Sequence, residues 1–189
     1  MRLVLASSSP RRRELLARIG IVPERIEAPA IDESPLPREL PRAYALRLAE
    51  AKALAAARAP GEIVLAGDTT IALGRRILPP ADGEEVQRRL LELLSGRRHH
   101  ALSAVALVGL DGAVRLRLSD TIVAFKRLSA DEIDSYVRSG EGLGKAGGYA
   151  IQGRAEALVR FVSGSHSGVV GLPLFETRAL LVSGGYLRG

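Results

Sequence analysis

The chain has 189 residues, 47% of them hydrophobic and 25% charged, which is enough to bury one ordinary core but not several. The absence of cysteine excludes a disulfide scaffold, a thiolate metal site and thiol catalysis, and three histidines argue against a histidine-rich metal site. No apolar run reaches 18 residues, and the apolar opening at Leu3 to Ala6 is too short for a signal peptide. We therefore expect one cytoplasmic domain that does not cross a membrane.

The charge balance is basic, because 24 arginines and 3 lysines outnumber 21 acidic residues and give a net charge of +6. Such a balance favours anionic partners without naming one. The chain has no asparagine and two glutamines, a depletion of thermolabile side chains that is typical of a thermophile. GC-rich codon usage would also favour arginine over lysine, so both explanations stay open.

The first part of the chain alternates apolar runs with helical stretches. Leu3 to Ala6 predicts a buried strand, and Ser9 with Pro10 predicts the start of a helix that ends at Gly20. The other elements expected here are a strand over 24–28, an irregular loop over 32–41, a long helix over 41–59, and a strand over 63–66 that continues over 69–73. This part of the chain is therefore predicted to contain both strands and helices.

The second part contains a hairpin and several capping patterns. Asp82 with Glu85 predicts a capping box that opens a helix closed by Gly96. The Asp111-Gly112 pair joins runs of alternating hydrophobicity over 101–110 and 113–125, which predicts a hairpin.

After the hairpin, Ser129 with Glu132 predicts another capped helix that ends at Gly140. A glycine-rich stretch over 140–153, short strands around 158–162 and 168–170, and a last helix after Pro173 complete the chain. Mixed strands and helices with a long hairpin predict an α/β or α+β class.

The segment from Ser7 to Arg13 predicts an anion site. It combines hydroxyl groups, the free N–H groups of a helix N-terminus and three guanidinium groups. Cationic side chains in a first helical turn oppose the helix dipole, a local cost that a ligand-binding site would explain. The structural alternative is an N-cap followed by a solvated basic face. No P-loop motif occurs.

A carboxylate, Asp68, follows the apolar run Val64 to Gly67. At the end of a buried strand it would lie at the rim of the sheet, where it could hold a divalent ion or take a proton from water. The alternative is an ordinary turn aspartate. Glu33 adds a carboxylate in the proline-rich loop, and Lys52 lies within the long helix, although both residue types are common at surfaces.

The glycine-rich stretch contains Lys145 and Gln152. Glycines permit close approach of the backbone to a ligand, the lysine adds charge, and the glutamine amide can contact a base edge as donor and acceptor. A flexible loop is the alternative interpretation of the same composition.

Taken together, these segments resemble the Maf family of nucleoside triphosphate pyrophosphatases. The resemblance covers essentially the whole chain and rests on five blocks: Leu5 to Leu16, Asp68-Thr69, Leu94 to Gly96 with His99, Lys145 to Gly153, and Val169 to Leu174. It implies one domain over 1–189 with two lobes, a central mixed sheet, a cleft between the lobes and a fold like that of inosine triphosphate pyrophosphatases. The implied reaction is cleavage of a nucleoside triphosphate to the monophosphate and pyrophosphate, using a divalent metal such as Mg, Mn or Co. A homodimer is also implied.

The resemblance also assigns residues. Asp68 matches the proton acceptor of the family, Glu33 and Lys52 match its acidic and basic cleft residues, and Asp68 and Glu33 would hold the metal. The phosphate-binding start corresponds to Ser7, Ser9, Arg11 and Arg12, with Lys145 as a further cation. Arg11, Thr69 and Gln152 are similar to the members that prefer dTTP and UTP, rather than to the branch that acts on 7-methyl-GTP.

Two departures from the family pattern stand out. The chain reads Ala66-Gly67 where the order Gly-Ala is usual, and the segment at Leu78 to Ala81 lacks the lysine of a usual Gly-Lys-Pro. One cleft cation is therefore missing unless Arg75 or Arg76 replaces it.

Two other functions stay open. A nucleic-acid-binding module would explain the basic charge, but 4% aromatic residues, no tryptophan and dispersed arginines argue against it. A nucleotide-binding regulatory protein of the same fold without turnover would explain the missing lysine.

Overall fold

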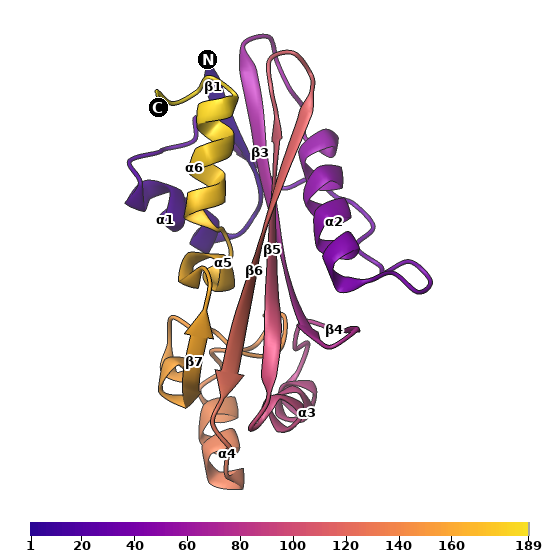
Figure 1. The fold of residues 1–189 in the computed structure, drawn as a ribbon, viewed down its shortest axis with the longest axis vertical. Helices are drawn as coiled ribbons and strands as arrows, with labels where there is room; N and C mark the ends of the chain where they lie inside the picture. Colours follow the sequence, from indigo (N-terminus) through magenta and orange to yellow (C-terminus); the bar gives the residue numbers. More distant parts are fainter. Residues whose placement is uncertain (189) are drawn as a thin grey trace.

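The computed structural model describes residues 1–188 and shows seven strands in one mixed sheet of order β2-β1-β3-β5-β6-β7, with β4 paired to β3 (Figure 1). The β1 strand runs parallel to β2 and β3, and the other pairs are antiparallel. The strands are β1 (Arg2–Ala6), β2 (Arg25–Glu27), β3 (Glu62–Leu73), β4 (Arg76–Leu78), β5 (Arg98–Val108), β6 (Val114–Phe125) and β7 (Val159–Ser163).

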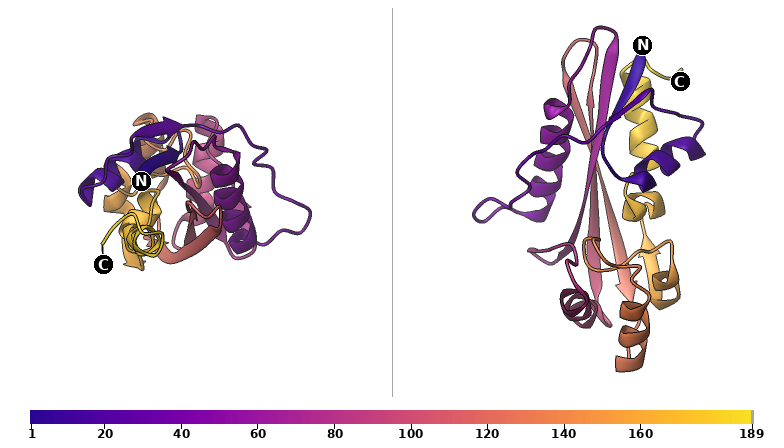
Figure 2. Two further views of the ribbon diagram at one scale, coloured as in Figure 1. Left: turned by 90° about the horizontal axis from the view of Figure 1, so that it is seen from above. Right: turned by 180° about the vertical axis from the view of Figure 1, so that it is seen from behind.

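Helices cover both faces of this sheet. In Figures 1 and 2, α2 lies on one face, α1 and α6 lie on the other, and α3 and α4 lie toward the opposite end of the long β5–β6 hairpin. The helices are α1 (Pro10–Arg18), α2 (Pro41–Ala55), α3 (Glu84–Leu94), α4 (Ala130–Arg138), α5 (His166–Val170) and α6 (Leu174–Ser183), with a 3₁₀ turn at Arg154–Leu158. No helix within residues 1–188 has the length and apolar character needed to cross a bilayer.

The two faces of the sheet bury different side chains. Ala45, Ala49 and Ala53 of α2 pack with small residues of the sheet such as Ala66 and Ala104, and this packing lets the helix lie close to the strands. The opposite face buries larger leucine, isoleucine and aromatic side chains. Because side chains alternate along a strand, consecutive residues of β3 belong to different cores.

A gap in the sheet edge positions the site. The pairing of β1 with β3 ends at Ala66, and the pairing of β4 with β3 begins at Ile71. Residues 67–70 of β3 therefore have no strand partner on this side within the described chain, although β5 pairs with them on the other side. At this gap, side chains from both faces of β3 reach the same opening.

The predicted mixed α/β class, the hairpin, the capping box at Ser129 and most elements are confirmed. The division into two lobes stays a prediction. Contrary to expectation, Asp68 does not follow a strand but lies inside the continuous strand β3, because β5 pairs through it from Val64 to Ala72.

Three boundaries also differ from the predictions. The long helix ends at Ala55 rather than 59, because the carboxylates of Glu27 and Glu62 accept the N–H groups of the residues that follow. The α3 helix begins after Gly83 without a side-chain cap, so the capping box predicted at Asp82 is wrong. Residues 168–170 belong to helix α5 instead of a strand, because the Ser165 hydroxyl caps this turn.

Candidate functional site

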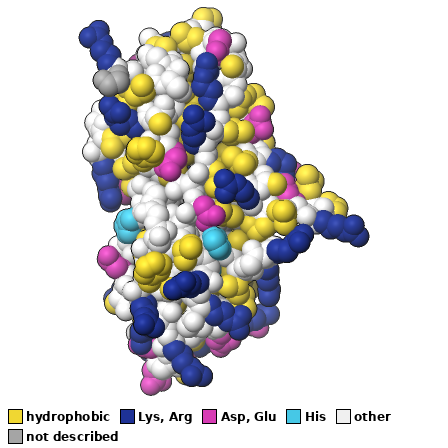
Figure 3. All heavy atoms as spheres, viewed as in Figure 1, with side chains coloured by type: hydrophobic (Ala, Val, Ile, Leu, Met, Phe, Trp, Pro, Cys, Tyr) yellow, Lys and Arg dark blue, Asp and Glu magenta, His cyan; other side chains and the backbone are white. Residues whose placement is uncertain are grey.

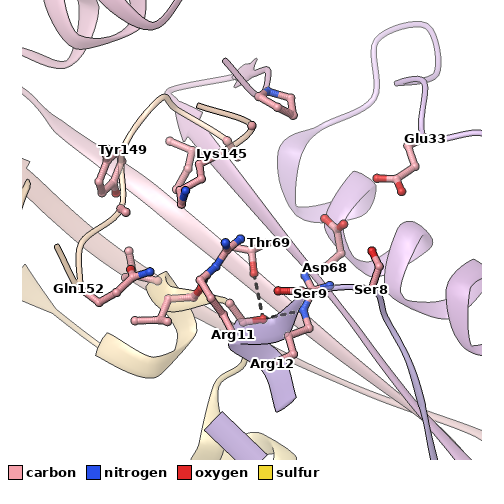
Figure 4. A pocket seen from close by; sticks show the side chains of 18 of the residues that line it. Ser8, Ser9, Arg11, Arg12, Glu33, Asp68, Thr69, Lys145, Tyr149 and Gln152 are labelled. Carbon is pink, nitrogen blue, oxygen red and sulfur yellow. Dashed lines mark hydrogen bonds between the residues drawn. The ribbon is translucent and has the colours of Figure 1, made fainter. Parts of the chain in front are cut away.

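A polar cavity of about 320 Å³ opens at the gap in the sheet edge. Nine of the ten predicted site residues line it: Ser9, Arg11, Arg12, Glu33, Lys52, Asp68, Thr69, Lys145 and Gln152. Figure 4 shows Glu33 and Gln152 toward opposite ends, with Asp68, Thr69 and Arg11 between them. Residues far apart in the sequence thus contribute to one cleft.

An ion cluster occupies the α2 side of the cleft. The Lys52 Nζ lies 2.9 Å from Asp68 Oδ1 and 3.0 Å from Glu33 Oε2, so one ammonium bridges two carboxylates. The Asp68 side chain is buried and also accepts a hydrogen bond from Thr70 Oγ1 at 3.0 Å, whereas Glu33 is exposed. Burial, together with the two negative charges, raises the pKa of Tyr44 to about 12. The cluster therefore places two carboxylates against one ammonium group.

The Arg12 guanidinium is held by two hydrogen bonds. Its Nε donates to the Gly171 carbonyl at 2.9 Å, and its Nη1 donates to Ser7 Oγ at 2.9 Å. Burial lowers the pKa of Arg12, and the Asp68 charge opposes this shift. Ser7 is buried and does not line the cleft, so its hydroxyl orients Arg12 instead of facing the opening. A Cβ at Gly67 would lie 3.4 Å from Arg12 Nε, so the glycine leaves room for the guanidinium.

Two further cations lie in the cleft with fewer restraints. Arg11 Nε donates to the Val170 carbonyl at 3.3 Å, and Lys145 is half-buried. Burial and the nearby Arg11 charge lower the pKa of Lys145. Within residues 1–188, neither Arg11, Arg12 nor Lys145 forms an ion pair, so this side of the cleft has positive charge for an anionic ligand.

The glycine-rich stretch packs on a buried aromatic cluster. Tyr149 lines the cleft, and its hydroxyl lies 2.8 Å from Nε2 of the buried His99. Only glycine fits at position 142, because a Cβ there would lie 2.0 Å from the Gly148 carbonyl oxygen. The stretch therefore packs closely on itself at Gly142, and Gln152 stands exposed near its end.

Neutral hydroxyl groups form the remaining wall. Thr69 Oγ1 lies 2.9 Å from Ser103 Oγ and 3.3 Å from the Gly171 carbonyl oxygen. Ser103 is fully buried on β5, directly opposite Thr69 in the strand register. This wall belongs to the face of β3 opposite Asp68.

Sequence reasoning missed several residues of the site. Tyr149 lines the cleft, Thr70 binds Asp68, and Ser103 binds Thr69. Their signals were weak: Ser103 is a lone hydroxyl within an apolar run, which only the register across β3 and β5 connects to the cleft.

The chain matches the family described as Maf-like protein over residues 2–183. The chain belongs to this family. A dTTP/UTP pyrophosphatase of Sphingopyxis alaskensis is 72% identical to this Maf-like protein over 187 residues, which cover 99% of this chain and 98% of that protein. A dTTP/UTP pyrophosphatase of Rhodospirillum rubrum is 58% identical over 188 residues, covering 99% and 90% of the two chains.

Among solved structures, a HAM1 protein from Coxiella burnetii aligns with a TM-score of 0.50 and 18% identity, over 97% of this chain and 99% of that chain. This likeness concerns the fold.

The missing lysine of this Maf-like protein has no visible replacement. Arg76 lines a separate surface hollow with Pro79, and Arg75 lies in the exposed turn before it. Within the described chain, neither arginine lines the cleft. The cleft therefore has Pro80 where the family pattern predicts a cation.

The carboxylates of the cluster fit a divalent ion. Asp68 and Glu33 each have an oxygen within 3.0 Å of the same cationic nitrogen, so both reach one point in the cleft. No group of three or more His, Asp or Glu side chains arranged to hold a metal occurs within residues 1–188. This donor set suits Mg²⁺ or Mn²⁺, which is often bound by one or two carboxylates together with substrate phosphates and water.

Proposed function

We propose that this protein hydrolyses dTTP and UTP to the nucleoside monophosphate and pyrophosphate. The observation that carries the proposal is the cleft itself, which joins a lysine-bridged carboxylate pair to unpaired cations at Arg11, Arg12 and Lys145. The substrate preference follows that of the two relatives, both dTTP/UTP pyrophosphatases, which are 72% and 58% identical to this chain over nearly its whole length.

The cations would bind the triphosphate. Four negative charges repel an approaching water oxygen, and fixed guanidinium groups lower that repulsion without reorganising during the reaction. Arg12, held by Ser7 and Gly171, supplies such a fixed charge. Arg11 and Lys145 would stabilise the leaving pyrophosphate together with the hydroxyl groups of Ser8 and Ser9.

Asp68 and Glu33 would hold a divalent metal, which supplies charge neutralisation and a more acidic water when bound. We assign Asp68 as the proton acceptor, because its buried carboxylate is held in one orientation by Lys52 and Thr70. The attacking water gives its proton to this carboxylate as its oxygen bonds to the α-phosphorus and the bond to the pyrophosphate oxygen breaks. Lys52 donates to Asp68 Oδ1 at 2.9 Å and so holds the carboxylate in place before the step.

Pyrophosphate release from dTTP, UTP, CTP and 7-methyl-GTP, with and without Mg²⁺, Mn²⁺ or Co²⁺, tests this function. We expect metal-dependent turnover of dTTP and UTP, and a loss of about 10²-fold or more for Asp68→Asn with nucleotide binding retained. Near-normal turnover of Asp68→Asn would contradict the assignment of this residue. A wild type that releases no pyrophosphate from any nucleotide would contradict the function.

A second candidate is a nucleotide-binding regulator without turnover. The observation in its favour is that the cleft contains Lys52 and Lys145 but no lysine in the segment that includes Pro80. The same assay separates the two candidates, because the regulator would bind UTP but release no pyrophosphate. A nucleic-acid-binding role has less support, because the basic side chains in Figure 3 are scattered over the face shown.

A cytoplasmic location and a homodimer complete the proposal. The location is supported by the short apolar runs of the sequence, and the dimer by the family resemblance. Cell fractionation tests the location, and light scattering of the purified protein tests the dimer.

A further inference from the structure

The loop over 28–40 brings Glu33 to the cleft without a hydrophobic anchor. It contains three prolines, forms no helix or strand, and projects beside α2 in Figure 1. Every residue of this loop is at least partly exposed, yet Glu33 Oε2 lies 3.0 Å from Lys52 Nζ. Because burial of apolar side chains does not hold the loop, polar contacts decide where Glu33 lies.

Arg47 of α2 fastens the loop at two points. Its Nε and Nη2 donate to the two carboxylate oxygens of Glu39, each at 2.7 Å, which is the bidentate geometry that a planar guanidinium permits. The same Nη2 donates to the Ser34 carbonyl at 3.1 Å. Glu39 in turn accepts the Leu36 N–H at 3.0 Å. One side chain therefore holds both the turn over 36–39 and the residue directly after Glu33.

Tyr44, one turn before Arg47 on α2, binds the backbone of Glu33 itself. Its hydroxyl donates to the Glu33 carbonyl at 2.8 Å, and the Arg47 guanidinium lies over its ring, with Cζ 5.5 Å from the centroid. The raised pKa of Tyr44, about 12, keeps this donor protonated at neutral pH. Within residues 1–188, the side-chain hydrogen bonds and ion pairs that reach the loop from outside come from Tyr44, Arg47 and Lys52.

We propose that Tyr44 and Arg47 position Glu33 beside Asp68, so that the two carboxylates can hold one divalent cation. This inference rests on the proposed function, in which Asp68 and Glu33 hold the metal. Tyr44 and Arg47 are positioning residues, because they act through the backbone and turn of the loop. Lys52 alone is not sufficient, since water screens its attraction for an exposed glutamate and ordering the loop costs conformational entropy.

Titration of Mn²⁺ into the protein bound to the α,β-imido analogue of UTP tests this role without turnover. For Arg47→Met we expect the Mn²⁺ affinity to fall about tenfold, as is typical when a group that orients a metal ligand is removed. Tyr44→Phe removes one hydroxyl and retains the ring, so the expected loss is about fivefold. Arg42→Met is the control on the same helix. Arg42 is exposed and its carboxylate partner is Asp120, at 4.0 Å, so its removal should leave the affinity unchanged.

Glu33→Gln separates positioning from a general loss of stability. If Arg47 acts through Glu33, Arg47→Met should change the Mn²⁺ affinity little in the Glu33→Gln protein, because the carboxylate that it positions is gone. An equal loss with and without the Glu33 carboxylate would overturn the inference. If Arg47→Met does not fold, Tyr44→Phe completes the same cycle, and wild-type affinity in folded Tyr44→Phe would also overturn it.

Trypsin cleavage after Arg38 reports on the loop directly. Arg38 is exposed within the same loop, and cleavage there requires the loop to leave its place on α2. We expect cleavage several-fold faster in Arg47→Met than in Arg42→Met, and an unchanged rate would contradict the role of Arg47 in holding the loop. The proposed function fails separately, through the absence of pyrophosphate release by the wild type.

Discussion

The two faces of β3 meet in one cleft but present opposite kinds of chemistry. On the α2 face, Asp68 belongs to a cluster of charges in which Lys52 bridges Asp68 and Glu33. On the other face, Thr69 belongs to neutral hydrogen bonds whose directions are fixed by backbone carbonyls. Adjacent residues of a strand thus separate a charged wall, made of Asp68, Glu33 and Lys52, from a hydroxyl wall, made of Thr69 and Ser103, because the gap in the sheet edge exposes both.

The charged wall predicts the largest effect. Removing the Lys52 charge in Lys52→Met should lower kcat by about 10²- to 10³-fold, the loss typical of removing one preorganised charge contact in an active site. It should also tighten Mn²⁺ binding to the nucleotide-free protein, because Asp68 and Glu33 then lack their internal cation. Isothermal titration with Mn²⁺ measures this affinity independently of turnover.

Lys145→Met is the matched control. Lys145 lines the same cleft but forms no ion pair with Asp68 or Glu33, so its removal should leave Mn²⁺ affinity nearly unchanged. Weaker Mn²⁺ binding by Lys52→Met would show that the lysine does not compete with the metal.

The buried aromatic cluster of His99, Phe125 and Tyr149, on which the glycine-rich stretch packs, predicts a pH effect on stability. Burial, aided by the His100 charge, lowers the pKa of His99 to about 4 from 6.5. Between these values the unfolded chain binds a proton that the folded protein excludes, so the free energy of unfolding falls as the pH drops from 6.5 toward 4. The expected loss is about 3 kcal/mol.

Urea unfolding at pH 7 and pH 4.5 measures this loss. His99→Phe should flatten the dependence, because it removes the buried titrating group while keeping the aromatic cluster with Phe125 and Tyr149. His100→Ala is the control at an adjacent, partly exposed position and should retain most of the slope. Equal slopes in the wild type and His99→Phe would contradict the role of His99.

The sequence made most elements predictable because their signals are local. Ser129 with Glu132 forms the capping box, and Asp111-Gly112 lies in the turn between β5 and β6. The errors lie where contacts distant in sequence decide the conformation. The Gly67-Asp68 pair has the composition of a turn, yet nine residue pairs with β5 keep β3 extended through it.

The residues of the candidate site also fall into those that the sequence made predictable and those that depend on contacts distant in sequence. Composition and family resemblance were sufficient to single out Asp68 and Arg12, whose residue types carry obvious chemistry. They gave no sign that Ser7 turns away from the cleft, because that depends on its hydrogen bond to Arg12. They also missed Ser103, which becomes a neighbour of Thr69 only through the register of two strands.

The exposed Gln152, at the end of the glycine-rich stretch, predicts a change in substrate preference. Gln152→Glu replaces an amide that donates and accepts by a carboxylate that only accepts. The ratio of kcat/KM for UTP over CTP should fall by about three- to tenfold, since a lost hydrogen bond is worth about 1 kcal/mol. An unchanged ratio in the nucleotide panel would remove Gln152 from base recognition.

The smallest expected effect concerns Gly67, which lies on the same face of β3 as Thr69. A Cβ at this position would lie 3.3 Å from the Ala104 carbonyl oxygen, so the pairing of β3 with β5 must adjust slightly in Gly67→Ala, and it would contact Arg12 Nε at 3.4 Å. We expect KM for UTP to rise about two- to threefold while kcat changes little, because Arg12 is the residue that we propose to bind the substrate phosphates and Asp68 lies on the other face of β3. The control is Gly83→Ala, where a Cβ meets no atom within 4 Å. If Gly67→Ala instead lowers kcat at constant KM, the crowding is transmitted to the charged wall, and the two faces of β3 are not independent.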